Sequence, residues 1–245
     1  MLDSIREYLI GLLLGLPGII FAITVHEYAH ALVSSALGDP LPKASGRLTL
    51  NPFRHIDPIG LLMLIVLRFG WARPVYIDPR FYKHKKLDTA LSALAGPVAN
   101  FLLAFVMVLV EFVLNIVYGS VSDSLSSFWV TAMSVVYTMV DYTVIVSVGL
   151  GLFNLIPIAP LDGSKVLYAF LPFKAYEKAI RAERIGLIIL VLLMFNVPGR
   201  VLEIVGVPYW ITMWLDLSFY LGFARNICIA GFEWFWAAVL GLFGL

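Results

Sequence analysis

Long uncharged stretches dominate the pattern of hydrophobic and polar positions along the chain. The first runs from Tyr8 to Val25, 18 residues without a charge, and its helical pattern continues to Leu37, where Gly38-Asp39-Pro40 ends it. A helix over these 30 residues would be about 45 Å long. The hydrocarbon core of a bilayer is only about 30 Å thick. The helix must therefore tilt, kink at Pro17-Gly18 or project into water.

Similar stretches follow further along the chain. Thr89 to Val110 is a second span of 22 uncharged residues, and a third runs from about Val130 to Ile156 with one acid inside it. Beyond a basic, polar stretch, Ile185 to Pro198 and Val205 to Leu245 supply two or three more. The pattern thus predicts an all-α polytopic membrane protein with about five to six transmembrane helices.

The region between the first two spans has a different character. Leu61 to Leu67 is apolar but too short to cross a membrane, and Leu48-Thr49-Leu50 and Arg73-Pro74-Val75-Tyr76-Ile77 combine turn residues with β-formers. We expect a short β-hairpin or re-entrant region here. Non-helical backbone at that depth persists only against protein or water.

Composition narrows the class of protein. Hydrophobic residues make up 61% of the 245-residue chain and charged residues 13%, which excludes a disordered chain, a coiled coil and a nucleic-acid binder. A soluble globule of this size could not hide so much apolar surface. Without repeats or low-complexity linkers, the simplest organisation is one membrane-embedded domain over residues 1–245, with a core at about 8–172 and C-terminal helices at about 185–245.

The basic residues predict the orientation in the membrane. Fourteen of the 17 lysines and arginines lie in residues 38–86 and 157–184, and none lies in residues 116–128. The positive-inside rule places the two basic segments in the cytoplasm and the N-terminus outside. The first and third spans then end at the same, cytoplasmic face of a cell membrane.

A metal-binding pattern stands near the inner end of the first span. His26-Glu27-Tyr28-Ala29-His30 is an H-E-x-x-H, and residues four apart on an α-helix lie one turn above each other. Both imidazoles can therefore reach one Zn²⁺, and Glu27 is placed to take a proton from a metal-bound water. The alternative is a helix-end histidine pair that hydrogen-bonds to neighbouring spans.

A catalytic zinc needs a third protein ligand. Asp162 is the best candidate, because two prolines break the third span as it approaches the inner face and free the backbone to bring a carboxylate inward. The orientation puts Asp141 and Glu111 in the outer half instead. The alternative role for Asp162 is to cap the helix that begins at Ser164.

These residues resemble the site-2 protease family of intramembrane zinc metalloproteases. The resemblance rests on His26-Glu27-x-x-His30 in a first span and on Asn154…Pro157…Leu161-Asp162-Gly163, and it covers roughly residues 8–172. Four intervening stretches are similar to the compact prokaryotic branch, which lacks PDZ and CBS domains: Arg47-Leu48-Thr49-Leu50-Asn51-Pro52, His55-Ile56-Asp57-Pro58-Ile59-Gly60, Phe69-Gly70-Trp71-Ala72-Arg73-Pro74-Val75 and Ala95-Gly96-Pro97-Val98-Ala99-Asn100.

The resemblance implies a role for each site residue. His26, His30 and Asp162 bind one Zn²⁺ per chain, Glu27 is general base and then acid, and Asn154 holds substrate backbone or the developing oxyanion. One departure is visible, since Ala159 stands where the family usually has a proline. The expected function is hydrolysis of peptide bonds within or near transmembrane segments of other membrane proteins.

Other roles remain open at this stage. A non-proteolytic metal-binding or metal-transport protein would use the same ligands, although Glu27 would then have no task. Asn100, after Gly96-Pro97, is expected to support helix packing. His55 is expected at the surface or in a structural role, or near enough to gate the site. The segments around Leu48–Leu50 and Val75–Ile77 are expected to offer an edge to an unwound substrate by β-augmentation.

Overall fold

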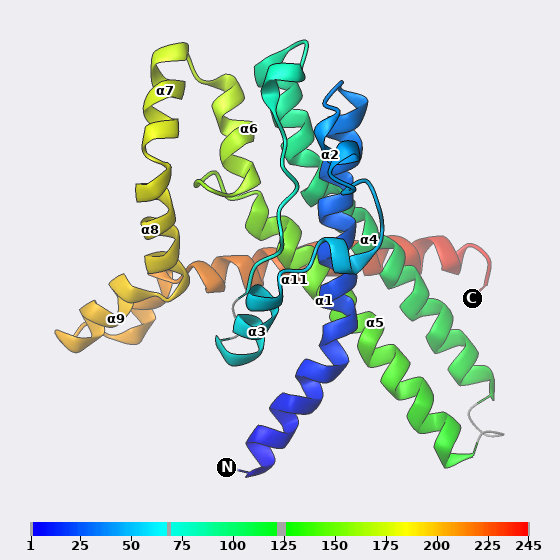
Figure 1. Cartoon of the computed structure of the whole chain (residues 1–245). Coiled ribbons are helices and arrows are strands. Elements are labelled where there is room, and N and C mark those ends of the chain that lie inside the picture. Colours follow the sequence, from blue (N-terminus) through cyan, green and yellow to red (C-terminus); the bar gives the residue numbers. More distant parts are fainter. Residues whose placement is uncertain (1, 68–69, 122–125, 245) are drawn as a thin grey trace.

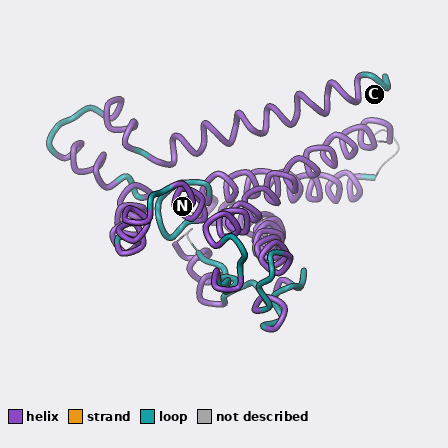
Figure 2. Tube along the Cα trace, turned by 90° about the horizontal axis from the view of Figure 1, so that it is seen from above, coloured by secondary structure: helices purple, strands orange, loops and turns teal. Residues whose placement is uncertain are grey.

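The computed structural model describes residues 2–67, 70–121 and 126–244, and every regular element in those ranges is helical. Figure 2 accordingly contains helices and loops and no strand. Phe69, which opens one of the motifs, lies outside the described residues. The elements are α1 (Leu2–Ala36), α2 (Leu41–Ala44), η1 (Pro52–Arg54), α3 (Pro58–Leu67), η2 (Pro79–Phe81), α4 (Lys85–Val121), α5 (Ser127–Asn154), α6 (Asp162–Phe170), α7 (Phe173–Arg181), α8 (Glu183–Met194), α9 (Val197–Ile204), α10 (Tyr209–Thr212), η4 (Met213–Leu215) and α11 (Leu217–Gly241).

Three helices are long and apolar enough to cross a membrane: α1 over Arg6–Ala36, α4 over its whole length, and α5 over its whole length. A fourth span is possible if α8 and α9, bent by 55° at a short break, count as one. The prediction of five to six spans is therefore too high for the described part of the chain. Charges at Arg225 and Glu233 interrupt α11, which runs across α4 and α5 rather than alongside them (Figure 1).

The long helices pack through small residues. Pro17 lies inside α1, and Figure 1 shows this helix bending near its middle, as a proline in a helix interior causes. The next residue, Gly18, faces α5 so closely that a Cβ there would lie 2.7 Å from Thr143 Oγ1. A glycine is therefore required where α1 and α5 cross.

The buried apolar cluster sits between α4 and α5. Its fully enclosed members are Ala104 and Val108 of α4 and Val144 and Val148 of α5. Cys228, Ile229, Phe232 and Trp236 of α11 cover it. The indole Nε1 of Trp236 also donates to the Phe105 carbonyl oxygen at 2.8 Å. This contact attaches α11 to the bundle.

The predicted β-hairpin is absent from the described residues, so that prediction is wrong. Residues 70–77, here named the strap, run extended beside α1 (Figure 1) and make one isolated antiparallel bridge, Ile56 to Ala72. The Arg73 N–H donates to the His55 carbonyl oxygen at 2.8 Å. Past the other end of the strap, the Asp78 N–H donates to Asp39 Oδ2 at 2.9 Å. The strap is thus held at both ends by loops, without a partner strand.

Candidate metal centre

The metal-ligand pattern on α1 folds as its spacing predicts. His26 and His30 lie one turn apart on the same face of the helix, and their Nε2 atoms are 3.0 Å apart. Both side chains are buried. Two imidazoles therefore point their outer nitrogens at one position inside the protein.

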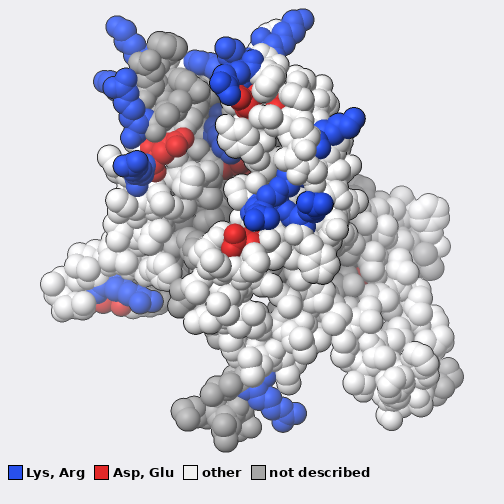
Figure 3. All heavy atoms as spheres, in the orientation of Figure 1, with Lys and Arg blue, Asp and Glu red and all other residues white. Residues whose placement is uncertain are grey.

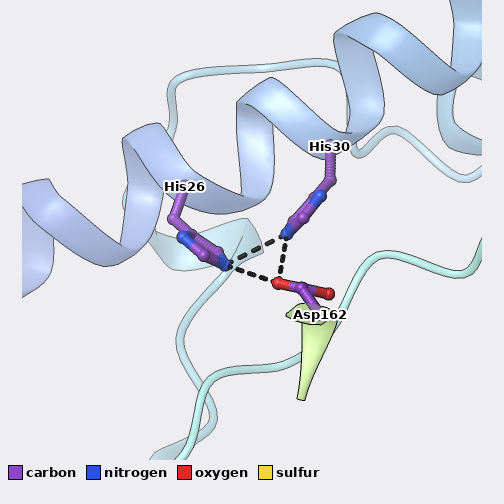
Figure 4. Close-up of side chains that lie close together, drawn as sticks. All are labelled: His26, His30 and Asp162. Atoms are coloured by element: carbon purple, nitrogen blue, oxygen red, sulfur yellow. Dashed lines mark hydrogen bonds and ion pairs between the residues drawn. The ribbon is translucent and has the colours of Figure 1, made fainter. Parts of the chain in front are cut away.

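Asp162 completes the cluster from the other side (Figure 4). Its Oδ2 lies 3.3 Å from His26 Nε2 and 3.0 Å from His30 Nε2, and its side chain is also buried. The chain leaves α5 at Asn154 and turns back, so that Asp162 begins α6 with Leu161 at the N-cap. The capping role considered for Asp162 is therefore not what the structure contains.

The turn depends on a close backbone approach at Gly163. A Cβ on this residue would lie 2.2 Å from the Leu155 carbonyl oxygen. Only glycine allows the first turn of α6 to pack this tightly against the end of α5, and that packing carries Asp162 to the histidines.

The third helix at the site is α4, which contacts the back of both imidazoles. His30 Nδ1 donates to the Ser92 carbonyl oxygen at 2.7 Å, and the Asn100 side-chain amide lies 3.2 Å from His26 Nδ1. Gly96 stands between these two contacts. A Cβ there would lie 2.4 Å from His30 Nε2, so the absence of a side chain lets α4 touch the rings.

The donor set fits a zinc ion. The three facing atoms are 3.0 to 3.3 Å apart, close to the edge of about 3.3 Å of a tetrahedron with metal–ligand bonds of 2.0–2.1 Å. Over the described ranges, this is the one group of three or more His, Cys, Asp and Glu residues whose ligand atoms lie within 4.8 Å of one another. Two imidazoles and a carboxylate leave a fourth position for water or substrate.

The carboxylate is kept in its ligating form. Burial raises the pKa of Asp162, but hydrogen bonds with His26 and His30 and the charge of Lys165 outweigh it and hold the pKa well below its usual range. The Lys165 ammonium donates to Asp162 Oδ1 at 3.0 Å, which leaves Oδ2 facing the imidazoles.

Glu27 lies next to the cluster and contacts the strap. Its side chain is buried, and its Oε2 accepts a hydrogen bond from the Val75 N–H at 2.9 Å. Asn154 is half-buried at the end of α5, and its Nδ2 donates to the Leu150 carbonyl oxygen at 3.0 Å. Both side chains line the same cavity as the three candidate ligands.

That cavity has a volume of about 490 Å³ and is mostly apolar beyond the cluster. The strap forms one wall, with Val75 and Ile77 among its lining residues, and α8 contributes Leu187, Leu190 and Val191. Sequence reasoning found no motif after Ile185 and so missed α8 as a wall. Aliphatic residues give no chemical signal that could have found it.

His55 has a structural place in this arrangement. The side chain is fully buried, and its Nε2 lies 2.8 Å from the Thr49 carbonyl oxygen. It therefore holds the loop that anchors the strap, which agrees with the structural alternative of the sequence analysis.

Comparison with known proteins gives one family. The model of peptidase family M50 matches residues 14–197. "Putative zinc metalloprotease YwhC" of Bacillus subtilis is 37% identical over 181 residues, which cover 74% of this chain and 80% of that protein. "Putative zinc metalloprotease Rip2" is 26% identical over 227 residues in Mycolicibacterium smegmatis, covering 89% of this chain and 81% of that protein. In Mycobacterium tuberculosis H37Rv it is 27% identical over 222 residues, covering 88% and 77%. No solved structure gives a significant match.

Proposed function

Because the chain belongs to peptidase family M50 and is a zinc metalloprotease of that family, we propose that it is an intramembrane endopeptidase. Its substrates would be other membrane proteins, cut within or near their transmembrane segments, either to release a regulator or to clear remnants. The carrying observation is the buried His26, His30 and Asp162 cluster, which opens with Glu27 into a cavity between apolar helices. The working unit would be the whole chain, with its catalytic core at about 8–172.

In this proposal His26, His30 and Asp162 hold one zinc ion per chain. When bound, zinc polarises the scissile carbonyl and lowers the pKa of water towards about 7. Glu27 takes the proton of the attacking water and later delivers it to the leaving amine. The hydrogen bond from the Val75 N–H to its Oε2 orients the carboxylate and leaves Oε1 for proton transfer.

Asn154 is proposed to bind substrate backbone or the developing oxyanion. One of its two amide hydrogens is donated to the Leu150 carbonyl oxygen, which fixes the side chain at the cavity wall. The second hydrogen remains for a substrate oxygen, and a donor aimed at developing negative charge stabilises the transition state.

The strap is proposed to receive the unwound substrate. Amides in a helix are already hydrogen-bonded, so a transmembrane substrate must be extended before it is cut. The strap runs extended along the cavity with its ends tied by His55 and Asp39, and this geometry supports pairing with a peptide by β-augmentation. Crosslinking of bound substrate to residues far from the strap would contradict it.

The orientation is proposed from the distribution of charge. In Figure 3, lysines and arginines gather over the end of the molecule that holds α2, α6 and α7, and the opposite end is nearly free of charge apart from a basic group beside the N-terminus. The positive-inside rule makes the basic end cytoplasmic and the N-terminus external. The metal centre then lies toward the cytoplasmic face of the cell membrane.

The test is zinc content together with cleavage of a model transmembrane substrate in proteoliposomes, for the native protein, Glu27→Gln and Glu233→Gln. Glu233 is an exposed carboxylate on α11 and serves as the matched control. We expect about one zinc per chain in all three proteins, and a loss of cleavage of about 10²- to 10⁴-fold for Glu27→Gln only. Native protein without zinc, or undiminished cleavage by Glu27→Gln, would refute the proposal. Zinc without cleavage of any segment would favour the metal-binding or transport alternative.

A further inference from the structure

The two imidazoles that face Asp162 are each contacted from behind by α4, and the two contacts differ in chemistry. His30 Nδ1 lies 2.7 Å from the Ser92 carbonyl oxygen. A carbonyl oxygen can only accept, so this nitrogen carries the hydrogen of the ring. When the ring is neutral, as an imidazole that binds a metal must be, the lone pair of His30 is then on Nε2, the atom that faces the candidate metal position.

His26 Nδ1 meets the side-chain amide of Asn100. The Asn100 side chain is fully buried, its Nδ2 lies 3.2 Å from His26 Nδ1, and its Oδ1 is buried without a hydrogen-bond partner. In this orientation Nδ2 donates to His26 Nδ1, which forces the ring hydrogen onto Nε2. A protonated Nε2 cannot bind a metal, so the orientation conflicts with the donor set built by His30 and Asp162.

Turning the amide by 180° removes the conflict. The nitrogen and oxygen of an asparagine amide have nearly the same shape and are distinguished by their hydrogen bonds. With Oδ1 toward the ring, this buried oxygen accepts a hydrogen bond from His26 Nδ1, which then carries the hydrogen of the ring. His26 Nε2 then presents its lone pair to the metal position. Both histidines then have the same tautomer.

We propose that Asn100 Oδ1 accepts the hydrogen of His26 Nδ1 and that Asn100 is thereby the positioning residue that sets this histidine for metal binding. The proposal rests on the proposed function, because it presumes zinc at His26, His30 and Asp162.

The position of Asn100 on α4 supports this role. Ser92, Gly96 and Asn100 are spaced four residues apart, so they form one stripe on the helix that faces α1. The outer two positions each restrain one ring nitrogen, and the glycine between them lets the helix approach. Packing, the role expected from the sequence, accounts for Gly96 but leaves the buried amide of Asn100 unexplained. Outer-shell acceptors of this kind fix ring orientation and ligand basicity at metal sites.

Zinc affinity separates a positioning role from packing. We would measure it by chelator competition on the full-length protein in detergent, for the native chain, Asn100→Leu, Asn100→Asp and Asn115→Leu. Asn100→Leu removes the acceptor at similar volume and is expected to weaken zinc binding by about 10- to 100-fold. Asn100→Asp keeps most of the affinity, because a carboxylate oxygen can only accept. Asn115→Leu, the same change on an exposed position of α4, leaves the affinity unchanged.

A second readout does not depend on zinc or on cleavage. With Co²⁺ in place of zinc, the native protein and Asn100→Asp should share one visible absorption spectrum, and Asn100→Leu should alter it, because the His26 ring is no longer held. A purely structural change would shift the melting temperature and leave the spectrum of the bound ion the same.

The outcomes are distinct. Native affinity and spectrum in Asn100→Leu would overturn the proposal, since packing alone would then explain the residue. Equal weakening by Asn100→Leu and Asn100→Asp would overturn it too, since the amide hydrogens would then matter. If Asn100→Leu fails to fold, the Asn100→Asp variant alone decides, and weak binding there is the refuting result. Absence of zinc from the native protein would refute the proposed function, and this inference with it.

Discussion

Gly96→Ala is the smallest change that tests how the metal centre is built. The added Cβ would lie 2.4 Å from His30 Nε2, 2.6 Å from His26 Cε1 and 2.7 Å from His26 Nε2. Non-bonded carbon contacts are optimal at about 3.5–4.0 Å, so the methyl group and the rings must separate by about 1 Å. The ligand atoms of a metal site must keep their distances to within about 0.2 Å. The required movement is several times larger.

Either response to the methyl group weakens the site. If the rings turn away from α4, their Nε2 atoms leave the position that faces Asp162. If α4 withdraws, the contacts of Ser92 and Asn100 to the two Nδ1 atoms are lost. Because both rings are displaced at once, we expect zinc affinity to fall by at least about 100-fold, the upper end of the range for loss of one outer-shell partner.

Chelator competition in detergent measures this, with Gly119→Ala as the matched control. Gly119 lies on the same helix, and a Cβ there would have no atom within 4 Å, so its variant should bind zinc as the native protein does. The melting temperature of each zinc-free protein shows whether the fold survives. Affinity within about twofold of native for Gly96→Ala in a folded protein would mean that α4 does not touch the rings, and the description of the site would be wrong.

Three further substitutions test the surroundings of the site. Gly163→Ala would place a Cβ 2.2 Å from the Leu155 carbonyl oxygen, so we expect zinc-free, destabilised protein; native zinc content would contradict the described turn. Asp39→Ala removes a buried carboxylate that accepts three hydrogen bonds. It should lower the free energy of unfolding by about 3 kcal/mol or more and expose the strap to protease; unchanged denaturant and proteolysis profiles would disprove the anchoring role. Trp236→Phe loses one hydrogen bond to the Phe105 carbonyl oxygen, so a cost of about 1 kcal/mol is expected with zinc affinity unchanged, and a fall in zinc affinity would show that α11 supports the centre.

The parts of the fold that the sequence predicted well are those that depend on local pattern. The expected spans over 8–37, 89–110 and 130–156 correspond to α1, α4 and α5, because a long uncharged run can be satisfied in lipid only as a helix. The prediction that His26 and His30 face one position needed only the helical repeat. The prediction that Asp162 joins them needed one further step, the positive-inside rule, which assigned the turn that carries Asp162 to the same face of the membrane as His30.

The predicted hairpin failed because local preference does not choose a hydrogen-bond partner. The β-formers of the strap do make it extended, but Pro74 has no N–H to donate. The N–H of Arg73 goes to the carbonyl oxygen of His55, and the N–H of Val75 goes to the side chain of Glu27. A loop and a helix therefore take two N–H groups of the strap that a second strand was expected to pair with.

The prediction of two or three C-terminal spans failed for a related reason. Val205 to Leu245 is apolar on average, and sequence length alone allows it to cross the membrane. In the structure α11 instead lies across α4 and α5 with Phe232 and Trp236 against their buried cluster. None of the described residues of α11 is fully buried, so only one side of it packs against its own protein. A contact between helices so far apart in the chain is not contained in any local window.

The outer shell of the metal centre was missed because two of its three parts have no distinctive side chain. Ser92 acts through its backbone carbonyl oxygen, a group that every residue has. Gly96 acts by having no side chain at all. Only Asn100 is chemically marked, and beside a glycine and a proline it was assigned to packing. A usable signal was present nevertheless. An asparagine in an otherwise apolar span is costly in lipid, so Asn100 must face a polar neighbour. The small residues four and eight positions before it allow another helix to approach closely, and in this chain the H-E-x-x-H helix is the polar neighbour.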